Sequence, residues 1–273
     1  MADARIAGFL YNTPMNTTTR KKLCWITGAS TGIGAATALA MARDGWDVVM
    51  TARSSDKLEQ LAKLSSEFKG RLIPLPGDVT HKDGMTAAVE TIEKNYGPID
   101  LAILNAGVYI PEDIGSFSSD TFISQVQLNL FGAVFCLEAL LPFFIRRHKG
   151  HIALVASVAG YRGLPKSIGY GCSKAAMIHL AEALAIMGKR YGIKVQIINP
   201  GFVKTPLTDK NDFWMPFLID SGLAAQRIVE GLKTNKFEIT FPKRFSYLLK
   251  AVGLLPDRLY FAIAGKSLRE KGN

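Results

Sequence analysis

The sequence has few cysteines, few histidines and no long uninterrupted apolar run. Its three cysteines, Cys24, Cys136 and Cys172, show no paired spacing, so we expect buried thiols in a reducing compartment. The four histidines are scattered, and we expect no metal site. The longest apolar runs are shorter than a membrane span, and residues 1–14 lack the basic start and apolar core of a signal peptide. These absences favour a cytoplasmic protein.

Acidic residues are scarce at the two ends of the chain. The formal net charge is +10, of which residues 1–22 carry +3 and residues 233–273 carry +6. Residues 23–232 carry only +1. A nearly neutral body argues against a nucleic-acid-binding function, whereas the basic C-terminal end suits either an acidic partner or a membrane surface.

Short apolar runs alternate with helical stretches from residue 23 onwards. The alternation begins with a strand–loop–helix–strand unit. It consists of residues 23–27, a glycine-rich turn, a helix of small residues and residues 47–52. Further strands are predicted at residues 71–76, 99–104, 151–156, 194–198 and 237–242, and a long helix at residues 121–147. This alternation predicts an α/β fold with a doubly wound parallel sheet and helices on both faces.

The chain divides into three predicted segments. Residues 1–22 are polar and aperiodic, and we expect a flexible N-terminal extension. Residues 23–242 form one Rossmann-type catalytic domain. Residues 243–273 form a basic amphipathic C-terminal extension, which either lies on an anionic membrane or packs on the enzyme body or a second subunit and closes the cleft.

A glycine-rich loop, TGASTGIG, follows the first strand. Gly28, Gly32 and Gly34 allow the backbone to turn sharply and approach a phosphate at the start of the next helix. A tight turn without a ligand is the alternative. The second strand ends at Arg53 with no acid nearby, which favours the 2′-phosphate of NADP(H) over NAD(H), unless Arg53 is only a surface residue.

Other polar residues also follow predicted strands. Asp78 follows the third strand and suits either the adenine edge or a helix cap. The fourth strand ends at Asn105-Ala106-Gly107. Because ligands bind beyond the carboxyl ends of parallel strands, the glycine loop, Arg53, Asp78 and this tripeptide converge on one nucleotide site.

Tyr170 and Lys174 stand four residues apart, which places them one above the other on a helix. A nearby cation lowers a tyrosine pKa from its usual value of about 10, so the pair can act as a general acid and base. Ser157, at the end of the fifth strand, can orient a substrate oxygen. Asn129, in an apolar helix, either ties that helix to a neighbouring strand or holds a water near the site.

These pieces, together with Pro200-Gly201 and Thr205, occur in the order typical of the short-chain dehydrogenase/reductases, which the chain resembles over about residues 23–242. The resemblance implies a seven-stranded Rossmann fold and dimers or tetramers formed through the Asn129 and Tyr170 helices. It implies that Tyr170 protonates a carbonyl, Lys174 binds the ribose and lowers the Tyr170 pKa, Ser157 orients the carbonyl and Asn129 holds a water. The implied cofactor residues are Gly28, Ser30, Gly32, Ile33, Gly34, Arg53, Asp78, Val79, Asn105, Ala106, Gly107, Tyr170, Lys174, Pro200, Val203 and Thr205.

The chain departs from the family pattern at Cys172, where alanine is common, and in its long basic tail. We expect Cys172 to be a core thiol. The segments that should contact substrate are rich in apolar and aromatic residues, which favours a lipophilic substrate unless they pack on themselves or on a neighbouring subunit. The predicted substrate pocket comprises Tyr109, Tyr161, Leu164, Phe202, Trp214 and Phe217.

The predicted function is NADP(H)-dependent hydride transfer between the cofactor and a carbonyl or secondary alcohol, in particular reduction of a lipophilic ketone. One alternative is a reductase of 3-oxoacyl chains on an acidic carrier protein, docked through the basic ends. Another is a non-catalytic NADPH-binding regulatory protein, against which the intact Ser157, Tyr170 and Lys174 count.

Overall fold

Seven parallel strands form one sheet in a computed structural model that describes residues 20–210 and 215–269. The strand order is β3-β2-β1-β4-β5-β6-β7. The strands are β1 (Leu23–Thr27), β2 (Asp47–Thr51), β3 (Leu72–Pro74), β4 (Leu101–Leu104), β5 (Gly150–Val155), β6 (Ile193–Pro200) and β7 (Glu238–Phe241). The order reverses between β1 and β4, which confirms the predicted doubly wound Rossmann-type fold.

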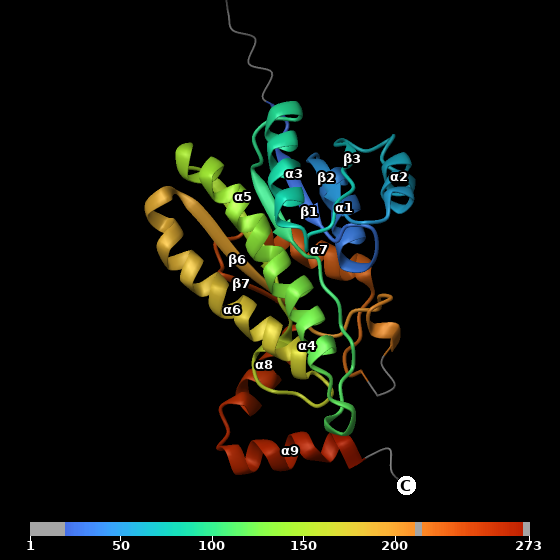
Figure 1. Ribbon diagram of the computed structural model, residues 1–273, viewed down its shortest axis with the longest axis vertical. Helices are drawn as coiled ribbons and strands as arrows, with labels where there is room; N and C mark the ends of the chain where they lie inside the picture. The colour runs from blue at the N-terminus through green and yellow to red at the C-terminus, as the bar shows by residue number, and fades with distance from the viewer. Residues whose placement is uncertain (1–19, 211–214, 270–273) are drawn as a thin grey trace, which may run out of the picture.

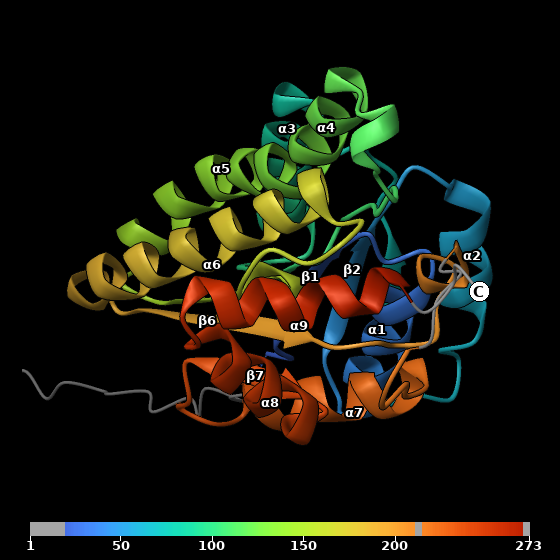
Figure 2. The same cartoon turned by 90° about the horizontal axis from the view of Figure 1, so that it is seen from below.

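Helices cover both faces of the sheet (Figures 1 and 2). The helices are α1 (Gly32–Arg43), α2 (Ser55–Lys63), α3 (Lys82–Asn95), α4 (Ser119–Val126), α5 (Gly132–Arg146), α6 (Ile168–Gly188), α7 (Ser221–Leu232), α8 (Lys243–Gly253) and α9 (Asp257–Arg269). Helices α3 to α6 lie on one face, and α1, α2 and α7 on the other (Figure 2).

Successive residues of β1 enter different cores, which explains why the strand is apolar throughout. Trp25 packs with residues of α3, α5 and α6, whereas Cys24 and Ile26 pack with residues of α1 and α7. All three are fully buried. A strand covered on both faces buries every side chain, so its sequence shows no alternation.

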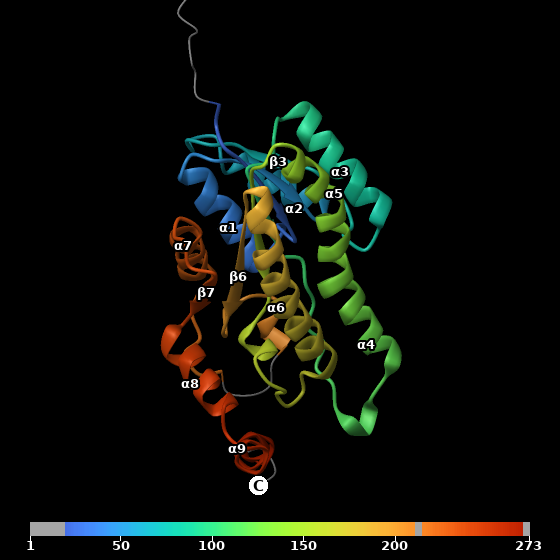
Figure 3. The same ribbon diagram turned by 90° about the vertical axis from the view of Figure 1, so that its left-hand side faces the viewer.

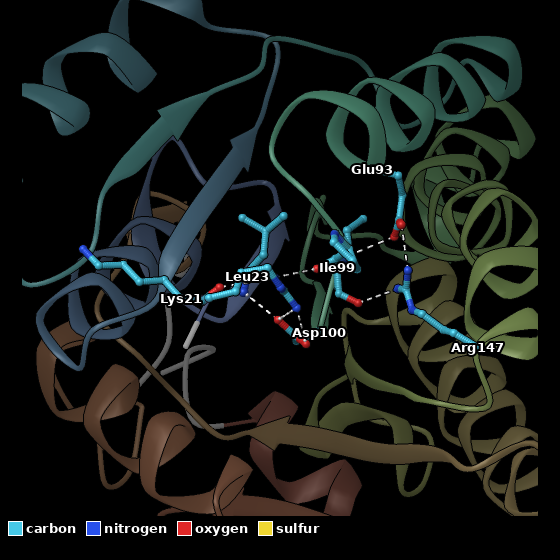
Figure 4. Close-up of polar contacts among 8 residues, drawn as sticks. Lys21, Leu23, Glu93, Ile99, Asp100 and Arg147 are labelled. Atoms are coloured by element: carbon cyan, nitrogen blue, oxygen red, sulfur yellow. Dashed lines mark hydrogen bonds and ion pairs between the residues drawn. The ribbon is translucent and has the colours of Figure 1, made fainter. Parts of the chain in front are cut away.

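The amino end of the sheet is held by ion pairs far from the strands' carboxyl ends (Figure 4). Asp100 accepts hydrogen bonds from the Leu23 amide at 2.9 Å and from the Arg20 guanidinium at 2.8 Å. Beside it, Arg147 pairs with Glu93 at 2.6 Å and donates to the Ile99 carbonyl. These contacts fix the starts of β1 and β4, and they include Arg20 from the predicted N-terminal extension.

The predicted long helix at residues 121–147 is divided. A π-helical turn, Gln127–Phe131, joins α4 to α5, and Pro142 lies inside α5. Contrary to the expectation that no apolar segment reaches the length of a span, Ser119–Arg146 is 28 residues long and contains an 18-residue window with a mean hydropathy of 2.0. In the fold it packs against α3 and α6, so we interpret it as a core helix.

Candidate active site

The glycine loop between β1 and α1 is shaped by contacts that no larger residue could make. Gly28 adopts φ +65°, and a Cβ there would lie 2.7 Å from Ala106 Cα. A Cβ on Gly34 would lie 2.3 Å from the Gly28 carbonyl oxygen. The Thr31 side chain makes no capping bond to α1, so the helix start is open toward the cleft. Such a helix start suits a diphosphate.

Arg53 and Asp78 lie together at the ends of β2 and β3. Both line the cleft, and Arg53 is exposed. Partial burial alone would raise the pKa of Asp78. The hydrogen bonds from Thr80 and the charge of Arg53 have the larger, opposite effect, so the pKa of Asp78 lies below its usual value. Asp78 accepts from the Thr80 amide at 2.9 Å and so forms a local turn as well as part of the cleft wall. Lys57, on α2, lines the same region. It was not predicted as a cofactor residue, because an exposed lysine on a helix has no distinctive sequence pattern.

Asn105 supports the glycine loop. Its side-chain amide donates to the carbonyl oxygens of Thr27 at 3.0 Å and Gly28 at 3.1 Å. The Asn105 and Ala106 amides both donate to Thr27 Oγ1. The side chain is therefore used to hold the loop, and contact between Asn105 and adenine stays a prediction.

The remaining predicted cofactor residues also reach the cleft. Ser30, Gly32, Ile33, Val79, Gly107, Pro200, Val203 and Thr205 all contribute to its wall. A Cβ on Gly32, which adopts φ +56°, would press against Thr205 at 3.2 Å. The loop after β6 therefore closes over the glycine loop, and the cleft has the form expected for an extended dinucleotide.

Ser157, Tyr170 and Lys174 meet beyond the carboxyl end of β5. Ser157 stands two residues after the end of the strand, and Tyr170 and Lys174 lie in the first two turns of α6. Lys174 Nζ donates to the Val155 carbonyl oxygen at 2.9 Å. The Tyr109 ring packs edge-on against the Tyr170 ring, with centroids 5.2 Å apart. All four residues line the cleft, as predicted from their places in the sequence.

Burial dominates the titration of the two ionisable residues. It raises the pKa of Tyr170 to about 12, although the hydrogen bond to Ser157 lowers it. It lowers the pKa of Lys174 to about 8. The protein alone therefore does not show the predicted lowering of the Tyr170 pKa by Lys174. Tyr170 keeps its proton at neutral pH and can donate it.

Asn129 lies in the π-helical turn and ties it to the neighbouring loop. Its Oδ1 accepts from the Val108 amide at 2.7 Å, and its Nδ2 donates to the Val108 carbonyl oxygen and to Ser173 Oγ, each at 3.0 Å. A Cβ on Gly107 would lie 3.3 Å from Asn129 Oδ1 and 3.4 Å from Lys174 Nζ. The side chain thus fixes the wall beside Lys174, and a water held by Asn129 stays a prediction.

The outer half of the cleft is lined by apolar and aromatic residues. The whole cleft measures about 1120 Å³. Tyr109, Leu164 and Phe202 line it as predicted. Phe245, Leu249 and Ile263 of the C-terminal extension line it too. These three lining residues were not predicted from the sequence, because the amphipathic pattern of the tail does not specify which surface it covers.

Four predictions about single residues need correction or lie outside the described residues. Tyr161 is not part of the lining, because its hydroxyl donates to Glu238 on β7 at 2.5 Å. Phe217 is not part of the lining either; it is half exposed and packs against Phe245, with ring centroids 6.0 Å apart. Cys172 is exposed on α6 and is not a core thiol. Trp214 lies outside the described residues.

Arg162 connects the catalytic loop to the C-terminal extension. Its guanidinium donates to the carbonyl oxygens of Gly253 at 2.6 Å and Leu255 at 2.8 Å, and pairs with Asp257 at 2.5 Å. It also stacks over the Tyr260 ring, 3.9 Å from the centroid. Residues 253–260 are therefore fixed to a loop that begins at Ser157 and ends before Tyr170.

Known proteins are similar to this chain in sequence and in fold. Residues 22–215 match the family model of the short chain dehydrogenases. An uncharacterized oxidoreductase of Myxococcus xanthus is 32% identical over 239 residues, covering 88% of this chain and 94% of the relative. A 3-oxoacyl-acyl-carrier-protein reductase of Thermotoga maritima is 32% identical over 189 residues, covering 69% and 77%. A solved structure of ElxO with NADP bound is 25% identical, has a TM-score of 0.72 and covers 81% of this chain and 97% of its own.

The family match spans most of the sheet, the glycine loop and the residues from Ser157 to Lys174. The same residues line the cleft at the carboxyl ends of the strands. The chain belongs to the short-chain dehydrogenase family and is an oxidoreductase of that type.

Proposed function

We propose that the protein uses NADP(H) to reduce a lipophilic ketone, or to oxidise the corresponding secondary alcohol. The observation that carries this proposal is the meeting of Ser157, Tyr170 and Lys174 beside an apolar outer cleft. The glycine loop fits a diphosphate, and Arg53 with Lys57 supplies positive charge where a 2′-phosphate would lie. The similarity to a protein solved with NADP bound supports this cofactor.

Each residue of the site would have its own role in the hydride transfer. NADPH, when bound, supplies the hydride. Tyr170 donates its hydroxyl proton to the carbonyl oxygen, which gains negative charge as the hydride arrives. Ser157, hydrogen-bonded to Tyr170, orients that oxygen. Lys174 is a cation beside the cofactor ribose and helps Tyr170 to give up its proton.

The outer cleft favours an uncharged, bulky substrate. Tyr109, Phe202 and Phe245 present aromatic surface, and Leu164, Leu249 and Ile263 complete the apolar wall. A substrate that fills this wall gains about 25 cal/mol for each Å² of apolar surface that it buries. Small polar sugars and acids would not gain this binding free energy.

A panel of ketones of increasing apolar size, with NADPH consumption as the readout, tests the proposed function. We expect kcat/KM to rise with apolar size. Tyr170→Phe should lower kcat by about 10²- to 10⁴-fold, since it removes the general acid. Tyr191→Phe, in the short turn that follows the far end of α6, is the matched control. Turnover retained in Tyr170→Phe would contradict the proposed acid, and an inactive wild-type enzyme would favour a regulatory NADPH-binding protein.

The similarity to the Thermotoga reductase supports a second candidate, reduction of a 3-oxoacyl chain on a carrier protein. The basic C-terminal end would attract an acidic carrier. This candidate requires that a carrier-bound thioester reacts much faster than the free ketone and that the advantage falls steeply with salt. Equal rates for the two forms would remove it.

A homodimer through α4, α5 and α6 is part of the proposal. Exposed residues recur at helical spacing along α6, at Cys172, Ala175, His179, Glu182 and Ile186. On the adjoining helices, Ile123 and Phe131 are exposed, and Phe131 packs against Phe135 with ring centroids 6.3 Å apart. Helix α6 runs beside the consecutive helices α4 and α5 (Figures 1 and 3).

A further inference from the structure

One end of the molecule carries exposed apolar side chains from two distant parts of the chain. Helix α9 lies across this end, and the segment that leads into α4 projects from the same end (Figures 1 and 3). Six exposed residues define what we call the apolar end, and each is 49% to 88% exposed. They are Ile114, Phe117, Leu254, Leu259, Phe261 and Ile263.

One apolar face of the C-terminal extension packs on the body of the enzyme. Tyr260 is buried, and its hydroxyl donates to the Gly163 carbonyl oxygen at 2.5 Å. Phe245 is buried and packs on Phe202, with ring centroids 5.5 Å apart. Leu259 and Phe261 flank Tyr260 in sequence and point elsewhere, because adjacent residues of a helix lie about 100° apart. They lie on opposite sides of α9 and border a second face, which is turned away from Tyr260. Both side chains are more than half exposed, and the Phe261 ring also packs edge-on against the Tyr260 ring, with centroids 5.8 Å apart.

The charges around the tail indicate what this second face meets. Residues 243–273 contain seven Lys or Arg and two Asp or Glu, a net charge of +5. Lys243, Arg244 and Arg258 are exposed, whereas Asp257 is bound by Arg162. On the opposite rim, Asp113 accepts from the Gly115 amide in a local turn. Apolar residues beside exposed cations fit a surface with an apolar interior and anionic headgroups.

We propose that the apolar end docks on an anionic phospholipid bilayer. Leu254, Leu259 and Phe261 enter the boundary between headgroups and acyl chains, and Arg258 of α9 contacts the headgroups. Lys243 and Arg244, at the start of α8, add to the positive potential of the tail. Ile263 lines the cleft and is also half exposed, so the docking surface adjoins the cleft. The docking itself does not depend on the proposed reaction, whereas uptake of a lipophilic substrate from the bilayer does.

Co-sedimentation of the full-length protein with vesicles tests the proposal. Vesicles of phosphatidylcholine alone are compared with vesicles of equal parts phosphatidylcholine and phosphatidylglycerol. The protein should pellet with the anionic vesicles, and added salt should lower the bound fraction. The double variant Leu259→Glu/Phe261→Glu should bind on the order of ten-fold or more weakly, since it removes apolar anchors and adds negative charge.

The control is Leu64→Glu, a matched substitution of an exposed leucine after α2, which lies toward the opposite end of the molecule (Figure 1). It should bind anionic vesicles as the wild type does. NADPH fluorescence checks that each variant is folded, without any need for turnover. Wild-type protein left in the supernatant would overturn the proposal, as would equal binding of the double variant. Sedimentation velocity tests whether a second copy of the chain, instead of a bilayer, binds the apolar end. A dimer that only the double variant disrupts would show that it does.

Discussion

Arg53 has the most specific proposed role among the single residues of the cofactor cleft. It is an exposed cation that lines the cleft with Asp78, just beyond the carboxyl end of β2, where no acid is present for a ribose hydroxyl. A guanidinium binds a phosphate through charge-assisted hydrogen bonds, each worth about 1.5–3 kcal/mol.

Arg53→Ala should therefore weaken NADPH binding by about ten-fold or more and leave NADH binding nearly unchanged. Titration of cofactor fluorescence measures both affinities. Lys63→Ala, which removes an exposed cation from the other end of α2, is the control. Equal losses for the two cofactors would show that Arg53 does not recognise the 2′-phosphate.

The sequence predicted which residues reach the cleft better than how each is used there. Ser157, Tyr170 and Lys174 were placed correctly, because each stands at a strand end or on one helix face. Tyr161 was misplaced, since its partner Glu238 lies 77 residues away on β7 and leaves no local pattern. Cys172 was predicted buried from its chemistry, but its position on α6 turns it outward.

At the scale of elements, the C-terminal extension acts as one wall of the cleft. Helix α8 contributes Phe245 and Leu249, and α9 contributes Ile263. A second contact, the ion pair of Lys250 with Glu238, fastens α8 to β7. The amphipathic pattern of residues 243–269 predicted the helices, but packing on the body and contact with a membrane remained alternatives, because both require one apolar face.

Arg162→Ala should loosen this wall, because it removes two hydrogen bonds to carbonyl oxygens, one ion pair and the stacking on Tyr260. We expect KM for an apolar ketone to rise several-fold, NADPH affinity to stay unchanged and proteolysis in residues 243–269 to become faster. Arg190→Ala, which removes a stacked arginine at the far end of α6, is the control. An unchanged KM together with an unchanged proteolysis pattern would contradict the role of Arg162.

The division of the long apolar helix was also not predicted from the sequence. Residues 121–147 read as one helix, and the π-helical turn at Gln127–Phe131 was not predicted. Asn129 within it bonds to Val108 and Ser173. One extra residue in a turn depends on such tertiary bonds, which local propensity does not encode.

At the scale of the whole molecule, the proposed dimer surface lies apart from the catalytic cleft and the proposed membrane surface, which adjoin each other at Ile263. The helices α4 to α6 flank the sheet, and α9 crosses the end beyond its carboxyl edge (Figure 3). This separation allows one subunit to pair with another while each cleft stays beside a bilayer.

Phe131→Glu should therefore convert the dimer into monomers, since it places a charge in the apolar contact of α5 and its neighbours. Analytical ultracentrifugation measures the mass. Phe261→Glu, an equivalent change on α9, should leave the dimer intact. A wild-type monomer would contradict the proposed dimer, and dissociation by Phe261→Glu would place the contact at the apolar end instead.

The ends of the described chain lie far apart. Arg20 is bound to Asp100 at the amino end of the sheet, whereas α9 crosses the opposite end (Figures 1 and 4). An affinity tag joined before Arg20 would leave the substrate entrance clear, and one joined after α9 would crowd it. Enzyme immobilised through its N-terminal side would present its cleft to the solution, which makes that orientation the suitable one for surface-based binding assays and for coupling to a solid support.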